Sequence, residues 1–161
     1  MILVTVGTTD FDALIEAIDR LAPTLGEEVV AQIGQGAYEP RQVAEWFRLA
    51  PTLAPYYVRA RLVVSHGGLA TLMEVLRRGG RLVGVSNPDR YDRHQEELLS
   101  YLDEAGHLIW CRDLGQLAAA IAEASRRTFV PYEPPPCTIH QVIREYLQQQ
   151  RGAAGALPAM E

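Results

Sequence analysis

The sequence contains no lysine: all 15 of its basic residues are arginines. A chain without lysine cannot form a lysine Schiff base with a carbonyl substrate, and it cannot use the phosphate-binding lysine of a P-loop. Both chemistries are therefore excluded. Asparagine is also scarce and occurs only as Asn87.

Cysteine is nearly absent as well, with two residues, Cys111 and Cys137. Two cysteines cannot make a disulfide framework, so free thiols in a reducing compartment are the simpler interpretation. The histidines lack the spacing typical of metal ligands; they are His66, His94, His107 and His140. We therefore expect no metal and no cofactor.

Long hydrophobic runs are missing, so no transmembrane helix is expected. The N-terminus, MILVTVGTTDF, has no basic region and is typical of a strand, which argues against a signal peptide. The net charge of −5 argues against a nucleic-acid-binding surface. These features together favour a cytoplasmic protein with no nucleic-acid partner.

What is present suffices for one domain. The chain has 161 residues, of which 48% are hydrophobic and 22% charged. A domain of this size buries roughly two-thirds of its unfolded surface, so it needs neither disulfides nor metals to fold. We expect the domain to span residues 1–150 and the Ala- and Gly-rich residues 151–161 to form a flexible tail.

Short apolar runs alternate with segments of helical periodicity. Strands are expected at residues 2–6, 28–34, 61–65, 82–86 and 107–111, and residues 42–47 are ambiguous. Helices are expected at residues 11–21, 52–59, 69–78, 94–105, 114–125 and 138–149, the first capped by Thr8, Thr9 or Asp10. This alternation predicts an α/β fold: a Rossmann-like, mostly parallel sheet with helices on both faces.

Three expected loops carry small polar residues at strand ends. They are Gly7-Thr8-Thr9, His66-Gly67-Gly68 and residues 87–95. Ligands of open α/β sheets bind beyond the carboxyl ends of the strands. We therefore expect the three loops to meet at one edge of the sheet and to form the functional site there.

The most informative loop joins a strand to a helix through Gly67 and Gly68. The first amides of a helix are unpaired and attract phosphate, so this turn either binds phosphate or is simply a tight turn. Glu74 lies nearly two helical turns further on, and it could reach ribose hydroxyls or be an ordinary surface glutamate. His66 could donate to a phosphate or merely end the strand.

The order of these motifs resembles the C-terminal half of family 28 glycosyltransferases. The resemblance rests on S-H-x-G-x-x-T/S-x-x-E, then a strand ending in N-P, then D-x-H-Q-x-x-L, and it covers residues 1–125. The opening V-T-V-G-T-T-x-F-D-x-L-I is similar to the short stand-alone relatives: the catalytic subunit of the dolichol-linked N-acetylglucosaminyltransferase and bacterial exopolysaccharide subunits of the PssE type. The resemblance implies one lobe of a GT-B enzyme.

The resemblance also implies roles for individual residues. Those implied for the donor diphosphate are Gly7, Thr8, Thr9, Gly67, Gly68, Leu69, Ala70 and Thr71. Those implied for uridine are Trp46, Phe47 and Glu74, with the Trp46 ring on the base, although from the residues alone Trp46 is a half-buried strand aromatic. Those implied for the donor sugar are Asn87, His94 and Gln95. The chain departs from the pattern at Leu69, and its Arg90 and Arg93 could meet a second negative charge, such as a uronate.

The function implied is the donor-binding subunit of an inverting, metal-independent glycosyltransferase. It would move a sugar from a UDP-sugar to a lipid-diphosphate-linked saccharide at the cytoplasmic membrane face. His66 and His94 are weak candidates for the base, which is expected instead on the acceptor lobe of a membrane-anchored partner subunit. The segment 138–149 would pack on its own sheet or dock on that partner. The donor sugar stays open among GlcNAc, glucuronate, glucose and galactose.

Two alternatives belong to other classes. A non-catalytic nucleotide-sugar-binding module would support a partner enzyme without transferring sugar itself. Such a module could lose the sugar-reading Gln95, and because Gln95 and Glu74 are both present we favour the enzyme subunit. A dinucleotide-binding domain is disfavoured, because no G-x-G-x-x-G follows the first strand.

Overall fold

The computed structural model describes residues 1–88 and 94–154, and within them six strands form one parallel sheet. The strands are β1 (Ile2–Thr5), β2 (Val29–Gln32), β3 (Glu45–Phe47), β4 (Leu62–His66), β5 (Leu82–Val85) and β6 (Ile109–Cys111). Their spatial order is β3-β2-β1-β4-β5-β6, and each neighbouring pair is parallel. The predicted doubly covered parallel sheet is confirmed, and the ambiguous segment is a short edge strand.

Helices alternate with these strands. They are α1 (Asp12–Leu21), α2 (Ala54–Arg59), α3 (Leu69–Leu76), α4 (His94–Glu104), α5 (Leu117–Arg126) and α6 (Ile139–Ala154), with 3₁₀ turns η1 (Ala22–Thr24) and η2 (Leu114–Gln116). The expected caps of the first helix are wrong: α1 begins after Phe11 without a side-chain cap, because the Thr9 hydroxyl donates instead to the Val6 carbonyl oxygen, at 2.9 Å.

Two apolar layers cover the two faces of the sheet, because successive strand residues point to opposite sides. Ile2 and Val4 of β1 face the layer that contains the apolar residues of α1 and α5. Leu3, between them, faces the layer of α2, α3 and α4. Both layers consist mainly of buried aliphatic side chains, so the sheet is a rigid platform for the loops at its edge.

The strand order reverses between β1 and β4, which are neighbours in the sheet. The chain leaves β1 toward one side and β4 toward the other, and this divergence opens a crevice at the carboxyl ends of the strands. The loops that begin at Gly7 and Gly67 flank this crevice. The fold therefore brings two of the predicted site segments to the usual ligand position of such sheets.

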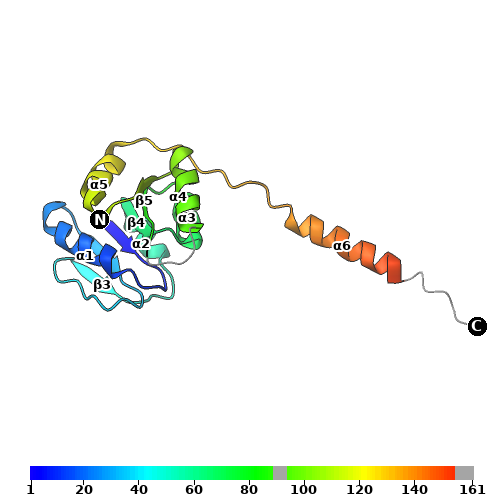
Figure 1. Cartoon of the computed structure of the whole chain (residues 1–161), viewed down its shortest axis with the longest axis horizontal. Coiled ribbons are helices and arrows are strands. Elements are labelled where there is room, and N and C mark those ends of the chain that lie inside the picture. Colours follow the sequence, from blue (N-terminus) through cyan, green and yellow to red (C-terminus); the bar gives the residue numbers. More distant parts are fainter. Residues whose placement is uncertain (89–93, 155–161) are drawn as a thin grey trace, which may run out of the picture.

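The last helix, α6, lies away from the sheet and its covering helices (Figure 1). Its apolar side chains, from Ile139 to Leu147, are each more than half exposed. The expectation that this segment packs on its own sheet is therefore wrong, because the extended, proline-rich residues 127–138 carry it away from the domain. The helix continues to Ala154, and residues 155–161 of the predicted tail lie outside the described residues. No helix in the described part of the chain has both the length and the apolar character of a membrane span.

Candidate functional site

A cavity of about 260 Å³, here called the edge cavity, lies at the carboxyl edge of the sheet. Its walls come from the loop after β1, the loop after β3, and helices α2 and α3. Five residues that the sequence singles out line it together: Gly7, Thr8, Ala70, Thr71 and Glu74. The structure thus unites the loop after the first strand with the glycine turn, as predicted.

Gln32 fixes two walls of the edge cavity relative to each other. Its side chain, 3% exposed at the end of β2, donates through Nε2 to the carbonyl oxygens of Gly7, at 2.8 Å, and Arg48, at 3.2 Å. Its Oε1 accepts a hydrogen bond from the buried Thr5 hydroxyl, which in turn accepts from the Gly7 amide. One amide therefore ties the loop after β1 to the loop after β3.

The ring of His66 is wedged between two glycines of the site. A Cβ atom on Gly68 would lie 2.3 Å from its Nε2, and one on Gly7 would lie 3.0 Å from its Cε1. Gly7 also has a φ of +65°, a conformation that favours glycine. The ring is 7% exposed, so both loops approach it as closely as their backbones allow. His66 therefore separates the two loops, and its buried ring is a poor candidate for the general base that deprotonates the acceptor hydroxyl.

Helix α3 presents its first amides to the edge cavity. Gly68 is its N-cap residue and provides no side-chain bond, and the Leu72 amide donates back to the Gly68 carbonyl oxygen at 3.1 Å. The amides of Leu69, Ala70 and Thr71 precede that bond, so they belong to the unpaired first turn of a helix. They and the helix dipole create positive potential where Ala70 and Thr71 line the cavity. The Leu69 side chain is largely exposed and does not line the cavity.

The predicted sugar-binding residues form a second cluster beside the same loops. A Cβ on buried Gly67 would lie 2.8 Å from Cβ of Gln95, so helix α4 packs directly against the glycine turn. Gln95 Oε1 accepts from the Asn87 amide at 3.1 Å, and Asn87 Nδ2 donates to the Asp10 carbonyl oxygen at 3.1 Å. Gln95 and Asn87 thus connect the loops after β5, β4 and β1.

The predicted uridine aromatics lie outside the edge cavity. Phe47 is half-buried and stacks on Tyr56 with ring centroids 4.7 Å apart, and its carbonyl oxygen accepts from Ile33 of the neighbouring segment. Trp46 is 37% exposed on the edge strand β3. The wall on that side is formed by residues 49–53, which follow β3 directly. The role implied for Trp46 and Phe47 stays a prediction.

Tyr57 of α2 faces Thr71 and Glu74 across the edge cavity. Burial and the negative charge of Glu74 raise the pKa of Tyr57 to about 12, while the Thr71 hydroxyl acts in the opposite direction. The Tyr57 hydroxyl is buried and has no hydrogen-bond partner among the described residues. Glu74 itself is exposed at the mouth of the cavity.

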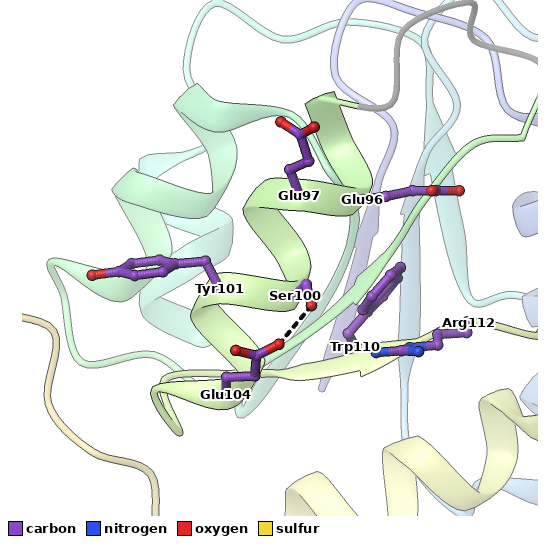
Figure 2. A pocket seen from close by; sticks show the side chains of 7 residues that line it. All are labelled: Glu96, Glu97, Ser100, Tyr101, Glu104, Trp110 and Arg112. Carbon is purple, nitrogen blue, oxygen red and sulfur yellow. Dashed lines mark hydrogen bonds between the residues drawn. The ribbon is translucent and has the colours of Figure 1, made fainter.

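A second, larger cavity of about 540 Å³ lies between α4 and β6 and shares no lining residue with the edge cavity. Trp110 and Arg112 lie next to each other beside α4 (Figure 2). The guanidinium carbon of Arg112 is 4.0 Å from the centre of the Trp110 indole ring. Three carboxylates line this cavity, those of Glu96, Glu97 and Glu104, against the single guanidinium. A diphosphate would meet net negative charge here, so the edge cavity suits an anionic ligand far better.

The remaining predicted residues lie around the site without lining the edge cavity. His94 is exposed at the start of α4, and Thr9 closes the turn after β1. Arg90 and Arg93 lie outside the described residues. Among residues 1–88 and 94–154 no three His, Cys, Asp or Glu side chains gather as metal ligands would.

Three parts of the cavity wall were not predicted from the sequence: Gln32, the segment 49–53 and Tyr57. Gln32 did carry a signal, because it is the single polar residue in the apolar run Val29 to Ile33. The other two carried none, since neither a loop nor a helix of six residues has a periodicity that shows which side is buried.

Comparison with known proteins places the fold among glycosyltransferase lobes. The glycosyltransferase SsfS6 from Streptomyces sp. SF2575, solved with thymidine diphosphate, matches with a TM-score of 0.62 at 24% identity over 79% of this chain and 33% of that one. MurG of Acinetobacter baumannii also gives 0.62, at 20% identity over 92% of this chain and 49% of that one. The chain therefore has the fold of one lobe of a GT-B glycosyltransferase.

The family profile of the glycosyltransferase family 28 C-terminal domain matches residues 1–146. The chain belongs to this family. A curated relative, the human UDP-N-acetylglucosamine transferase subunit ALG13, is 34% identical over 68% of this chain. The match covers 11% of that relative, so the chain spans about a tenth of the length of the human protein.

Proposed function

We propose that this chain is the donor-binding subunit of an inverting glycosyltransferase that takes a UDP-sugar. The observation that carries the proposal is the edge cavity, where the unpaired amides of α3, the loop after β1 and Glu74 meet. Such a cavity matches a nucleoside diphosphate in both charge and hydrogen bonding. Membership of the glycosyltransferase family 28 C-terminal domain supports the same reading.

The geometry supports one orientation of the nucleotide. The diphosphate lies at the first turn of α3 and against Gly7 and Thr8, because these backbones supply positive potential. Glu74, one and a half turns further along α3, receives the ribose hydroxyls. The base then lies against residues 49–53, because the diphosphate and the ribose occupy the other walls of the edge cavity. Trp46 precedes this segment in the sequence and would cover the base from the solvent side.

The donor sugar extends from the diphosphate toward α4. Gln95 packs against Gly67, and its carbonyl oxygen is engaged by the Asn87 amide. A sugar hydroxyl would therefore meet the NH₂ group of Gln95 as a hydrogen-bond donor. His94, exposed at the start of the same helix, is the neighbouring candidate contact.

Uridine as the base rests on the relatives. ALG13 is described as a subunit of a UDP-N-acetylglucosamine transferase, and SsfS6, which has the same fold, was solved with thymidine diphosphate. The nucleotide in each case is a pyrimidine nucleoside diphosphate, carrying a sugar in the first. We therefore propose a UDP-sugar donor and leave its sugar open among GlcNAc, glucuronate, glucose and galactose.

The acceptor side of the reaction requires a partner. Sugar transfer needs a base to deprotonate the acceptor hydroxyl and partial positive charge to hold the leaving diphosphate. The α3 terminus meets the second need, but His66 is wedged between glycines and His94 stands outside the edge cavity. We propose that a membrane-anchored subunit supplies the base and binds a lipid-diphosphate-linked saccharide at the cytoplasmic membrane face. The exposed apolar side of α6 is the surface we propose for docking that subunit.

Calorimetry with UDP tests the donor site. The full chain should bind UDP equally well in EDTA and in magnesium, because the amides of α3 provide the positive potential. Glu74→Ala should weaken binding about tenfold, as expected for the loss of hydrogen bonds to a charged group. Glu97→Ala, which removes an exposed carboxylate of α4, is the matched control and should leave UDP affinity unchanged. Strict dependence on magnesium would contradict the metal-independent mechanism.

A transfer assay tests the need for a partner. The purified chain is incubated with each UDP-sugar and a lipid-diphosphate acceptor, alone and with membranes of the source organism. We expect turnover only with the membranes. Robust multiple turnover by the chain alone would refute the half-enzyme proposal, whereas UDP binding without transfer under both conditions would favour the non-catalytic module.

A further inference from the structure

Tyr57 brings an unpaired hydroxyl group to the wall of the edge cavity. Its ring belongs to the apolar layer under α2 and α3 and is 9% exposed. Among the described residues the buried hydroxyl has no hydrogen-bond partner. A buried polar group without a partner is rare in folded proteins, and such a group in a cavity points to a bond that forms only with ligand present.

The acceptor for that bond is within the same cavity. Thr71 and Glu74 stand three residues apart on α3, so they share the helix face turned toward Tyr57. Burial and the Glu74 carboxylate both raise the Tyr57 pKa, so at neutral pH the phenol keeps its proton and can donate it to a carboxylate. A phenol that faces a carboxylate is a good donor for a charge-assisted hydrogen bond.

Resting on the donor site proposed above, we infer that Tyr57 is a positioning residue for Glu74. With a nucleotide bound, the Tyr57 hydroxyl donates to one carboxylate oxygen of Glu74, and the second oxygen accepts from the ribose hydroxyls. Glu74 is otherwise exposed, and its side chain would have to be ordered on binding. A partner that holds it reduces this entropic cost and makes the cavity selective for ribose.

The test compares two ligands with Tyr57→Phe, a substitution that keeps the ring and removes only the hydroxyl. Calorimetry on the full chain should show about tenfold weaker binding of UDP, the size expected for one hydrogen bond to a charged group. Binding of 2′,3′-dideoxy-UDP should not change, because that ligand offers Glu74 no hydroxyl. Tyr56→Phe is the matched control: it removes the neighbouring hydroxyl, 3.4 Å from Glu45, and should affect neither ligand.

Two further measurements separate positioning from a general structural role. The melting temperature of Tyr57→Phe should be no lower than that of the wild type, because the buried hydroxyl has no hydrogen-bond partner among the described residues. In a Glu74→Ala background, Tyr57→Phe should have no additional effect on UDP binding. Equal loss for both ligands, or unchanged UDP affinity, would overturn the inference. Failure of the wild-type chain to bind UDP would instead refute the donor site itself.

Discussion

Replacing Gln32 by methionine tests whether the edge cavity is built in advance by one buried amide. Methionine keeps the length and unbranched shape of glutamine but can neither donate to the Gly7 and Arg48 carbonyl oxygens nor accept from Thr5. The position is 3% exposed, so little water can replace these bonds at the side chain itself. The substitution therefore removes the link between two walls while leaving the packing largely intact.

The magnitude follows from the groups left behind. An unpaired buried polar group costs about 1–3 kcal/mol. The Thr5 hydroxyl is fully buried and keeps only its bond from the Gly7 amide, at 3.2 Å, whereas the two carbonyl oxygens lie nearer the cavity and can be partly hydrated. We expect a net destabilisation of about 2–3 kcal/mol, which lowers the melting temperature of a domain this size by about 6–8 °C.

Urea unfolding and UDP calorimetry measure the two consequences. The unfolding free energy should fall as stated, and UDP affinity should fall about tenfold, because the loops after β1 and β3 lose their fixed separation. The matched control is Gln35→Met, three residues further on, where the side chain is exposed. Stability and affinity equal to the wild type would refute the role given to Gln32, and loss of stability with unchanged affinity would confine that role to the fold.

Three other changes give separate checks. Asp19 is 2% exposed; burial alone would raise its pKa, but hydrogen bonds from the amides of residues 41–43 and the Tyr38 hydroxyl outweigh burial and lower it. A lowered folded pKa stabilises the fold above the unfolded value of about 3.9, so Asp19→Asn should cost about 2 kcal/mol at pH 7 in urea unfolding. The difference from wild type should shrink as pH falls below about 4, and a constant difference would contradict the assignment. Gly68→Ala should lower stability by about 1–3 kcal/mol and abolish measurable UDP binding by calorimetry, because the new methyl group would lie 2.3 Å from His66. Gln95→Ala should weaken UDP-sugar binding and barely change UDP binding; equal loss for both would move Gln95 to the nucleotide.

Local patterns predicted the parts of the site that depend on local structure. A glycine turn between a strand and a helix sets its own geometry, so the turn at Gly68 was predicted from the sequence, whereas the roles of Thr71 and Glu74 came from the family resemblance. The parallel sheet followed from the alternation of short apolar runs with helical periods. What brought the loop of Gly7 to the same cavity was the sheet order, which the fold class implies.

Other parts depend on tertiary contacts that no local pattern contains. Trp46 and Phe47 alternate on a three-residue edge strand, and only the packing of Phe47 against Tyr56 decides which ring is buried. Tyr57 lies on a helix of six residues, too short for a periodicity to show its buried face. For these residues the neighbours in space, and not the spacing in sequence, determine the role.

The amphipathic helix α6 shows most clearly that a local pattern can predict an element without predicting its tertiary contacts. Its apolar residues Ile139, Val142, Ile143, Tyr146 and Leu147 repeat at the spacing of one helix face, and the sequence predicted the helix correctly. The pattern requires a surface to bury that face but does not say which surface. Burying one large aliphatic side chain contributes about 1.5–3 kcal/mol, so a partner that covers most of the face would gain several kcal/mol. A helix of this length is marginal in water by itself, and covering its apolar face would therefore stabilise the helix and the subunit contact together.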